Sequence, residues 1–409
     1  MSAVRNYAVV TASYWGFTLT DGALRMLVLL HFYSLGYTPL MLSFLFLLYE
    51  AAGIFANLGG GWLAARFGIP RMLMTGLSLQ MAGLMLLSAL DPSWSAALSV
   101  TWVVAAQGIA GVAKDITKTA SKSAIKATSE GGSGQLFRWV AWFTGSKNAM
   151  KGAGFFVGGL LLETVGFRGA LWLMTAVLAL VLVGVSVSLP RTLGKAKASK
   201  SFRELFAKTR SINLMAAARV FLFGSRDVWF VVGLPVFLYS QGWRYMEVAG
   251  FIASWTIGYG LVQAIAPSVI RRSTDGLSRE VPEARLWGAV LTAIPLLLAL
   301  VVGSAHVARL DLVVTVGLGI FGFAFAAISS LHSYLILAYA GSAKAAEDVG
   351  FYYAANAGGR LIGILLSGAL TQAGGLEACL WGSAILLTLC LAITFFLPTA
   401  VSERRVTVA

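Results

Sequence analysis

The sequence predicts an all-α membrane protein with twelve transmembrane helices arranged as two six-helix pseudo-repeats. Composition is the first reason: 58% of the 409 residues are hydrophobic and only 12% are charged, whereas a soluble domain carries about 25% charged residues. Apolar runs of roughly 20 residues, long enough to cross the hydrocarbon core, recur along the whole chain. The period-two alternation of an outer-membrane barrel is absent.

Hydropathy places the twelve expected helices in two groups of six. The expected spans are 8–34, 40–64, 71–90, 96–117, 136–162, 169–189, 213–239, 247–269, 286–304, 312–338, 349–373 and 376–397. The corresponding domains are an N-terminal six-helix bundle (1–190), a cytoplasmic linker (191–212) and a C-terminal six-helix bundle (213–409). The linker is the longest basic stretch of the chain, which predicts an amphipathic segment on the membrane surface.

Internal similarity at a nearly constant offset is the other reason for two repeats. The pairs 206 residues apart are Asp21 with Asp227, "YSLG" (33–36) with "YSQG" (239–242), and Arg66 with Arg272. The pairs 209 residues apart are Lys151 with Arg360, Gly154 with Gly363, and Trp172 with Trp381. Such matches indicate duplication of a six-helix unit, and two such halves around a midplane site are typical of alternating-access transporters.

The net charge of +14 does not indicate nucleic-acid binding, because the basic residues are distributed as in a membrane protein. Of the 31 Lys and Arg residues, 20 fall in loops or tails on one side, and only Arg168, Arg244 and Arg309 fall on the other. Basic loops stay cytoplasmic. We therefore expect a multi-pass protein of the bacterial inner membrane, with both termini in the cytoplasm.

Charged residues within the expected spans are the main functional signal. The cations are Arg25, Lys114, Arg138, Lys147, Lys151, Arg219, Arg226 and Arg360, and the anions are Asp21, Glu50, Asp115 and Asp227. A charge at the bilayer centre costs about 2.5–3.5 kcal/mol on insertion scales, so such residues face a cavity or a partner. The excess of cations predicts a substrate with several negative charges and argues against a neutral sugar or drug.

The predicted substrate-binding set follows from this excess. It comprises Arg25, Lys114, Lys147, Lys151, Arg226, Asn356, Arg360 and His332. Arginine offers paired hydrogen bonds to phosphate-like oxygens, and lysine acts as a point charge. The four carboxylates Asp21, Glu50, Asp115 and Asp227 are predicted to pair with cations or to carry protons.

Local spacing adds narrower expectations for single residues. Arg25 stands four residues after Asp21, which favours an ion pair within one helix. Arg226 and Asp227 are sequence neighbours, so we expect their side chains to diverge. Lys114 and Arg219 lie near the cytoplasmic edge, where a long side chain can extend to the interface instead of binding substrate.

The stretch "GGWLAARFGIPR" (60–71) resembles the loop signature of the major facilitator superfamily. Gly61, Arg66 and Gly68 fit that signature and are predicted to form a gating loop, but its acidic position is Ala65. In the fifth span, Gly145, Gly154 and Gly158 resemble the superfamily's antiporter motif. Small residues at this spacing also serve simply to let helices approach closely.

A narrower resemblance covers the full chain. The stretches "RNYAVVTASYWGFTLTDGALRMLVLLHF" (5–32), "AKDITKTASKSAIK" (113–126) and "GSKNAMKGAGFFVGG" (145–159) are similar to organoarsenical efflux permeases of the ArsJ type. The resemblance implies export of 1-arseno-3-phosphoglycerate, functional pairing with a glyceraldehyde-3-phosphate dehydrogenase that makes this compound, and arsenate resistance. It assigns no binding residues.

Other functions are weakly indicated by the sequence. Cys379 and Cys390 form no metal-ligand pattern, so we expect no metal and no cofactor. No nucleophile with an acid–base partner compels an enzyme, and the loops are too short for a signalling domain. A sugar-phosphate or general organic-anion exporter remains open, as do uniport, proton antiport and phosphate exchange. We expect a monomer whose only partners are lipid, substrate and the metabolic enzyme.

Overall fold

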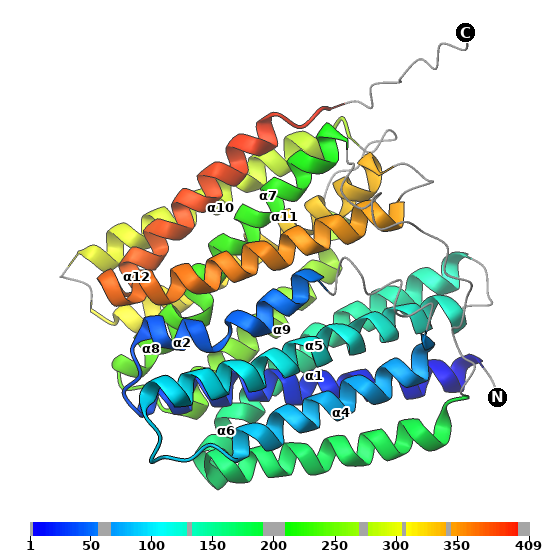
Figure 1. The fold of residues 1–409 in the computed structure, drawn as a ribbon. Helices are drawn as coiled ribbons and strands as arrows, with labels where there is room; N and C mark the ends of the chain where they lie inside the picture. The colour runs from blue at the N-terminus through cyan, green and yellow to red at the C-terminus, as the bar shows by residue number, and fades with distance from the viewer. Residues whose placement is uncertain are drawn as a thin grey trace.

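A computed structural model describes residues 3–55, 67–128, 133–190, 209–269, 277–304, 308–340 and 345–399. All regular secondary structure in these ranges is helical (Figure 1). The helices are α1 (Ala3–Ser34), α2 (Pro39–Leu45), α4 (Ile69–Ser88), α5 (Ala96–Thr128), α6 (Ser133–Ser188), α7 (Arg210–Val228), the π-helix η2 (Trp229–Gly233), α8 (Leu234–Ser240), α9 (Tyr245–Val269), α10 (Glu280–Gly303), α11 (Leu310–Tyr339) and α12 (Ala345–Phe395). The expected all-α membrane fold is confirmed, and seven helices within the described ranges are long and apolar enough to cross a membrane.

Two of these helix labels each cover two expected spans. The label α6 covers two helices, which correspond to 136–162 and 169–189 and are joined at Gly166, where the backbone is non-helical with a φ of 69°. The label α12 likewise covers two helices, which correspond to 349–373 and 376–397 and are joined at the non-helical residues Gly374 and Gly375. The expected second span, 40–64, begins as α2 and continues as helix to Phe55, the last described residue before a gap.

The backbone carries the repeat that the sequence predicts. Gly36 and Gly242 have φ values of 84° and 86°, and they are the last residues of the two similar "YSxG" stretches. Gly166 and Gly375, which are 209 residues apart, have φ values of 69° and 64°. Glycine is favoured at all four positions because side chains rarely adopt this left-handed region. Matched turns at matched offsets support duplication of a six-helix unit.

The two groups of helices lie side by side (Figure 1). In Figure 1, α4 and α6 lie on one side of the bundle and α7, α10 and α12 on the other, with α2 and α9 between them. The two groups meet where α2 packs on α12 and α6 packs on α9. The beginning of α1 and the end of α12 lie toward the same end of the bundle (Figure 1). The exact domain boundaries at 190 and 212 stay a prediction, although α7 already begins at Arg210.

The two halves are joined at the end of the bundle where α1 finishes and α2 begins. The rings of Tyr33 and Tyr239 make an edge-to-face contact with centroids 5.4 Å apart. The Leu40 amide donates a hydrogen bond to Gln372 Oε1 at 3.3 Å, which ties α2 to α12. Each contact crosses from one half to the other, so the structure is closed at this end.

Glycines allow the helix pairs α1–α6 and α7–α12 to pack backbone to backbone. A Cβ atom added at Gly158 in α6 would lie 2.9 Å from Ala23 Cα in α1. In the other repeat, a Cβ atom at Gly359 in α12 would lie 2.8 Å from Val220 Cα in α7. Two glycines of the antiporter-like stretch, Gly154 and Gly158, therefore have a packing role in this structure, as small residues do at membrane helix interfaces.

We expect Gly158→Val to lower the melting temperature of the purified protein and the amount inserted in membranes. The added side chain would push α1 from α6, and overpacking of this kind costs about 1–3 kcal/mol or more. Gly184→Val is the matched control in the same helix, because nothing lies within 4 Å of a Cβ atom there. Equal melting temperatures for the two variants would contradict the packing role.

Candidate substrate-binding site

A polar cavity lies between the two halves, lined by residues of α1, the helix ending at Phe55, α5, α6 and α12. Its charged lining residues are Lys114, Lys118, Lys147, Lys151 and Arg360, with Asp21, Glu50 and Asp115. The cations outnumber the carboxylates, as the sequence predicts for the spans as a whole. Cys379 and Cys390 are buried and do not line the cavity.

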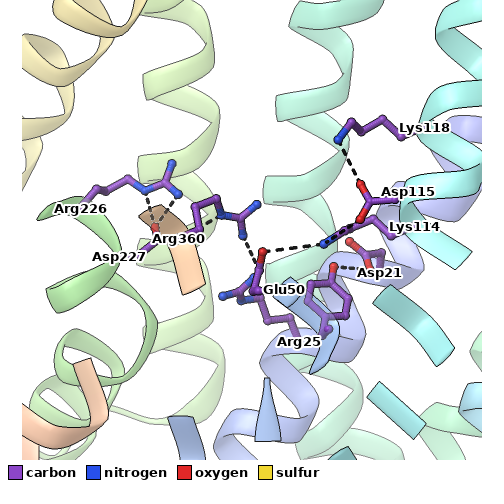
Figure 2. Close-up of polar contacts among 10 residues, drawn as sticks. Asp21, Arg25, Glu50, Lys114, Asp115, Lys118, Arg226, Asp227 and Arg360 are labelled. Carbon is purple, nitrogen blue, oxygen red and sulfur yellow. Dashed lines mark hydrogen bonds and ion pairs between the residues drawn. The ribbon is translucent and has the colours of Figure 1, made fainter. Parts of the chain in front are cut away.

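Glu50 is the centre of the charge network (Figure 2). Its Oε1 atom accepts hydrogen bonds from Arg25 Nη1 at 2.8 Å and from Arg360 Nη2 at 2.6 Å. Its Oε2 atom lies 3.8 Å from Lys114 Nζ. The side chain is only 1% exposed. Three cations from three helices therefore converge on one buried carboxylate.

Arg360 connects this centre to the C-terminal half (Figure 2). Its Nε atom donates to Asp227 Oδ2 at 3.1 Å, while its Nη2 atom donates to Glu50. Arg226 Nε donates to the other Asp227 oxygen at 2.6 Å. We expected Arg226 and Asp227 to diverge and Asp227 to pair elsewhere. The divergence is wrong, because the flexible arginine folds back onto its neighbour, but Asp227 does also pair with a distant residue, Arg360. The Glu50–Arg360 ion pair directly joins the two halves.

A second carboxylate, Asp115, sits between two lysines of its own helix (Figure 2). Lys118 Nζ donates to Asp115 Oδ1 at 3.0 Å, and Lys114 Nζ lies 3.9 Å from Oδ2. The Lys114 ammonium also lies 3.8 Å from the ring centroid of Tyr49, a distance at which a cation–π attraction is favourable. Lys114 therefore belongs to the cavity network and does not extend to the membrane surface.

Asp21 has a different partner from the one its spacing suggests. The Tyr49 hydroxyl donates to Asp21 Oδ1 at 2.6 Å, and Arg25 turns instead to Glu50. The expected Asp21–Arg25 ion pair is wrong, because a closer carboxylate on the neighbouring helix outcompetes the one a turn away. Asp21 is 5% exposed and lines the cavity.

Lys151 differs from the cations described so far. It lines the cavity, and its ammonium lies 5.6 Å from the ring centroid of Phe155. In the ranges that the structure describes, no carboxylate lies within ion-pair distance of it. Lys147, one turn earlier in α6, lines the same cavity. Among the described residues, Lys151 thus presents a positive charge to the cavity with no carboxylate at ion-pair distance.

Asn356 lines the cavity, and its orientation is fixed from behind. Arg219 Nε donates to Asn356 Oδ1 at 3.2 Å, and Arg219 Nη1 donates to the backbone oxygen of Ser329 at 3.2 Å. Arg219 is only 4% exposed, so the expectation that it reaches the interface is wrong. With its oxygen occupied, Asn356 offers its amide nitrogen as a donor to the cavity.

Three predicted binding residues do not line this cavity. His332 is fully buried in α11 and is absent from the lining. Arg226 is held on Asp227 beside the rings of Phe223 and Phe325. Arg25 lies behind Glu50 and borders a smaller, mostly apolar cavity instead. Their assignment to substrate contact therefore gains no support from the cavity lining.

Only part of the predicted gating loop can be placed. Gly61 and Arg66 lie outside the described residues. Gly68 immediately precedes α4 with a φ of 81°, a conformation that glycine adopts without strain. Its role in the turn into α4 is clear, and the gating role of the loop stays a prediction.

Aromatic residues around the site were not predicted from the sequence. Tyr14, Phe17 and Tyr353 line the cavity, and Tyr49 bonds to Asp21. The available signal was that Tyr49 directly precedes the intramembrane Glu50, and that Tyr14 lies two turns before Asp21 on the same helix. These rings can enclose the ligand and exclude water while the cations bind it.

The sequence matches the Major Facilitator Superfamily over residues 9–346. Among curated proteins, none matches the chain. The fold is similar to that of a nucleoside transporter, NupG, with a TM-score of 0.72 and 13% identity over 96% of this chain and 98% of that one. It is also similar to a POT family transporter in complex with 5-aminolevulinic acid, with a TM-score of 0.73 and 15% identity over 96% and 95% of the two chains.

A further solved structure, a POT family transporter in complex with a thioalcohol-conjugated peptide, has a TM-score of 0.74 at 15% identity. It covers 96% of this chain and 95% of its own. At such low identity these likenesses concern the fold alone, but the family match spans most of the chain. The protein belongs to the major facilitator superfamily, a family of membrane transporters that move small-molecule substrates across the bilayer.

Proposed function

We propose that the protein exports an organic arsenate or phosphate anion by alternating access, with 1-arseno-3-phosphoglycerate as cargo, and so confers arsenate resistance. The observation that carries the proposal is the cavity between the halves, in which five cationic side chains face three carboxylates. A buried excess of positive charge is costly without a compensating anion. A ligand with several negative charges supplies that compensation.

The donor set fits phosphate-like oxygens in particular. Arg360 and the lysines provide charged N–H donors, and Asn356 adds a neutral one. Charge-assisted bonds of this kind are short and strong with phosphate or arsenate oxygens. Trivalent arsenic prefers soft thiolate ligands, but both cysteines lie outside the lining. The arsenic itself rests on the resemblance to ArsJ-type permeases.

Transport requires the end of the bundle that is closed in this structure to open while the opposite end closes. The structure is closed where Tyr33 meets Tyr239 and where α2 meets α12. With the expected orientation of both termini in the cytoplasm, this is the outer end, and the cavity loads from inside. A bound anion screens the cations from one another and lowers the electrostatic cost of bringing the halves together at the inner end.

The membrane potential favours export of an anion, by about 2.3 kcal/mol per charge per 100 mV. Asp21, Glu50, Asp115 and Asp227 are candidate proton carriers if a counter-ion is used. Uniport, proton antiport and phosphate exchange remain distinct versions of the proposal. The protein acts as a monomeric carrier without cofactor or catalytic step, in the bacterial inner membrane, and is functionally paired with a glyceraldehyde-3-phosphate dehydrogenase.

The proposal is tested by arsenate resistance in cells that co-express the dehydrogenase. We expect wild type to raise the tolerated arsenate concentration, and Lys147→Ala, Lys151→Ala and Arg360→Ala to lose most of that increase. Arg244→Ala is the matched control, because its ion pair with Glu247 is exposed and far from the cavity lining. Full resistance in all three cavity variants, at normal membrane levels, would refute the site.

A second cargo is favoured by the same observation, because a cavity built for an organic phosphate has the same cations. Competition in everted vesicles separates the two cargoes. We expect the arsenylated compound to be transported in preference to glycerate phosphates. If both compete equally, the protein is an organophosphate or general organic-anion exporter and the arsenate assignment is wrong.

A further inference from the structure

We propose that Arg25, Lys114 and Arg360 form a binding subsite for one dianionic phosphoryl or arsenoryl group, and that Glu50 occupies this subsite in the empty carrier. This inference rests on the proposed function and adds where one end of the substrate binds. According to this inference, the Glu50 carboxylate competes with the substrate for the three cations, and the substrate displaces it.

Geometry is the first reason. Arg25 Nη1, Arg360 Nη2 and Lys114 Nζ lie 2.8, 2.6 and 3.8 Å from the Glu50 carboxylate oxygens. The three cations come from α1, α12 and α5 and share no helix. A converging set of two guanidinium groups and an ammonium is an arrangement suited to a phosphate-like oxyanion.

The match between Glu50 and its three cations is incomplete. A carboxylate has one charge and two oxygens, and Glu50 Oε1 takes both short hydrogen bonds while Lys114 stays 3.8 Å from Oε2. A phosphoryl group brings up to two charges and three acceptor oxygens. It can therefore give each cation its own oxygen, which Glu50 cannot.

Arg25 supplies an independent observation. The residue is 8% exposed, and its Nη2 atom is buried without a hydrogen-bond partner among the described residues. A buried, unsatisfied charged donor costs more than a neutral one. Glu50 lines the cavity and Arg25, directly behind it, does not. Movement of the Glu50 side chain would open Arg25 to the cavity and leave two of its donors for an incoming oxyanion.

Displacement of Glu50 also has a consequence for coupling. Glu50 and Arg25 belong to the N-terminal half, whereas Arg360 belongs to the C-terminal half. In the carrier without substrate, the Glu50–Arg360 pair links the two halves. In the loaded carrier, the substrate takes over this link. The two halves are then linked at the centre in both states, by Glu50 without substrate and by the substrate when it is bound. A carrier with neither link would leave Arg25, Lys114 and Arg360 to repel one another.

Binding to the purified protein in lipid nanodiscs tests the inference, with 3-phosphoglycerate as the probe. We expect Glu50→Gln to bind this probe at least about tenfold more tightly than wild type, since the loss of one charged competitor amounts to about 1.4 kcal/mol or more. Asp115→Asn is the matched control, because it also removes a charge beside Lys114 but contacts neither Arg25 nor Arg360.

The outcomes separate the inference from the proposed function. If wild type binds the probe and Glu50→Gln binds it equally or more weakly, the displacement model is wrong and the anion site remains. An equal gain in Asp115→Asn would also overturn it, because the effect would then be that of net charge alone. If no form binds 3-phosphoglycerate, this inference fails, and the resistance and vesicle assays with the arsenylated compound then decide the proposed function separately.

A conservative variant covers the case in which Glu50→Gln does not fold. Glu50→Asp keeps the charge but withdraws the carboxylate by one methylene, so it cannot reach Arg25 and Arg360 together. We expect it to bind the probe about threefold or more tightly than wild type, an effect of the size of one weakened charged hydrogen bond. Unchanged or weaker binding by Glu50→Asp would overturn the inference.

Discussion

Arg360→Ala is expected to lower both stability and transport more than any other single substitution in the cavity. The change removes one of three cationic partners of Glu50 and one of two partners of Asp227, and both carboxylates are 1% exposed. Removal of one partner from a buried ion pair costs up to about 3–5 kcal/mol when a charge is left without compensation. Arg25, Lys114 and Arg226 remain and reduce that cost here. The substitution also removes the direct ion pair between the halves and one of the proposed substrate donors.

The measurements are the melting temperature in detergent or nanodiscs and initial rates of uptake into everted vesicles. Arg360→Lys is the informative companion, because one ammonium cannot donate from two separated nitrogens to Glu50 and Asp227 as the guanidinium does. We expect it to restore stability in part and transport little. Arg226→Ala also removes a partner of Asp227 but spares Glu50, and a loss as large as that of Arg360→Ala would contradict the role of the bridge.

Lys151→Met is expected to separate stability from transport. Lys151 faces the cavity without a carboxylate at ion-pair distance among the described residues. Replacement of even a buried ion pair by apolar residues of similar volume is often neutral or stabilising by about 1–4 kcal/mol. A buried charge with no partner loses no such attraction when it is replaced, and its desolvation cost is removed. The empty protein should therefore melt at an equal or higher temperature, while the KM for the exported anion should rise at least about tenfold.

Lys118→Met provides the control for this separation. Lys118 also lines the cavity, but it donates to Asp115 at 3.0 Å, so its loss leaves a buried carboxylate with a more distant partner. We expect Lys118→Met to melt at a lower temperature than Lys151→Met. A lower melting temperature for Lys151→Met than for wild type, together with unchanged transport, would show that Lys151 is structural and does not await an anion.

Sequence periodicity was sufficient to predict the fold, because each transmembrane segment is determined by local hydropathy. The expected breaks near 166 and 374 are confirmed, because two helices meet at non-helical glycines in each place. The repeat was visible because duplicated turns need glycine at the same places, as Gly36 and Gly242 show. Hydropathy and turn glycines are both properties of short stretches, so they can be recognised in a single sequence.

Partners across helices were less predictable, because ion pairing depends on which helix faces are brought together. Arg25 was expected on Asp21, four residues away, but it bonds to Glu50, 25 residues away. The choice depends on how the helix that follows α2 packs against α1. The sequence of neither helix by itself determines how close Arg25 and Glu50 lie.

The symmetry between the halves misled in one respect. Lys151 and Arg360 are matched by the repeat, which predicted equal roles for them. The structure gives Arg360 two carboxylates, while Lys151 has none at ion-pair distance in the described ranges. The sequence holds a clue to this difference, because the residue 206 positions after Glu50 is Thr256. The cation is present in both halves, as Lys151 and Arg360, whereas the carboxylate at the position of Glu50 is present only in the N-terminal half.

The central claim is that an uncompensated positive cavity binds a multiply charged anion, and a thermal-shift series on the purified protein tests it most directly. A ligand that binds only the folded state stabilises it by RT ln(1 + [L]/Kd). We predict a concentration-dependent rise in melting temperature with 3-phosphoglycerate, a smaller rise with inorganic phosphate and none with glycerol. Equal shifts with glycerol and 3-phosphoglycerate, or no shift with any anion, would contradict the claim.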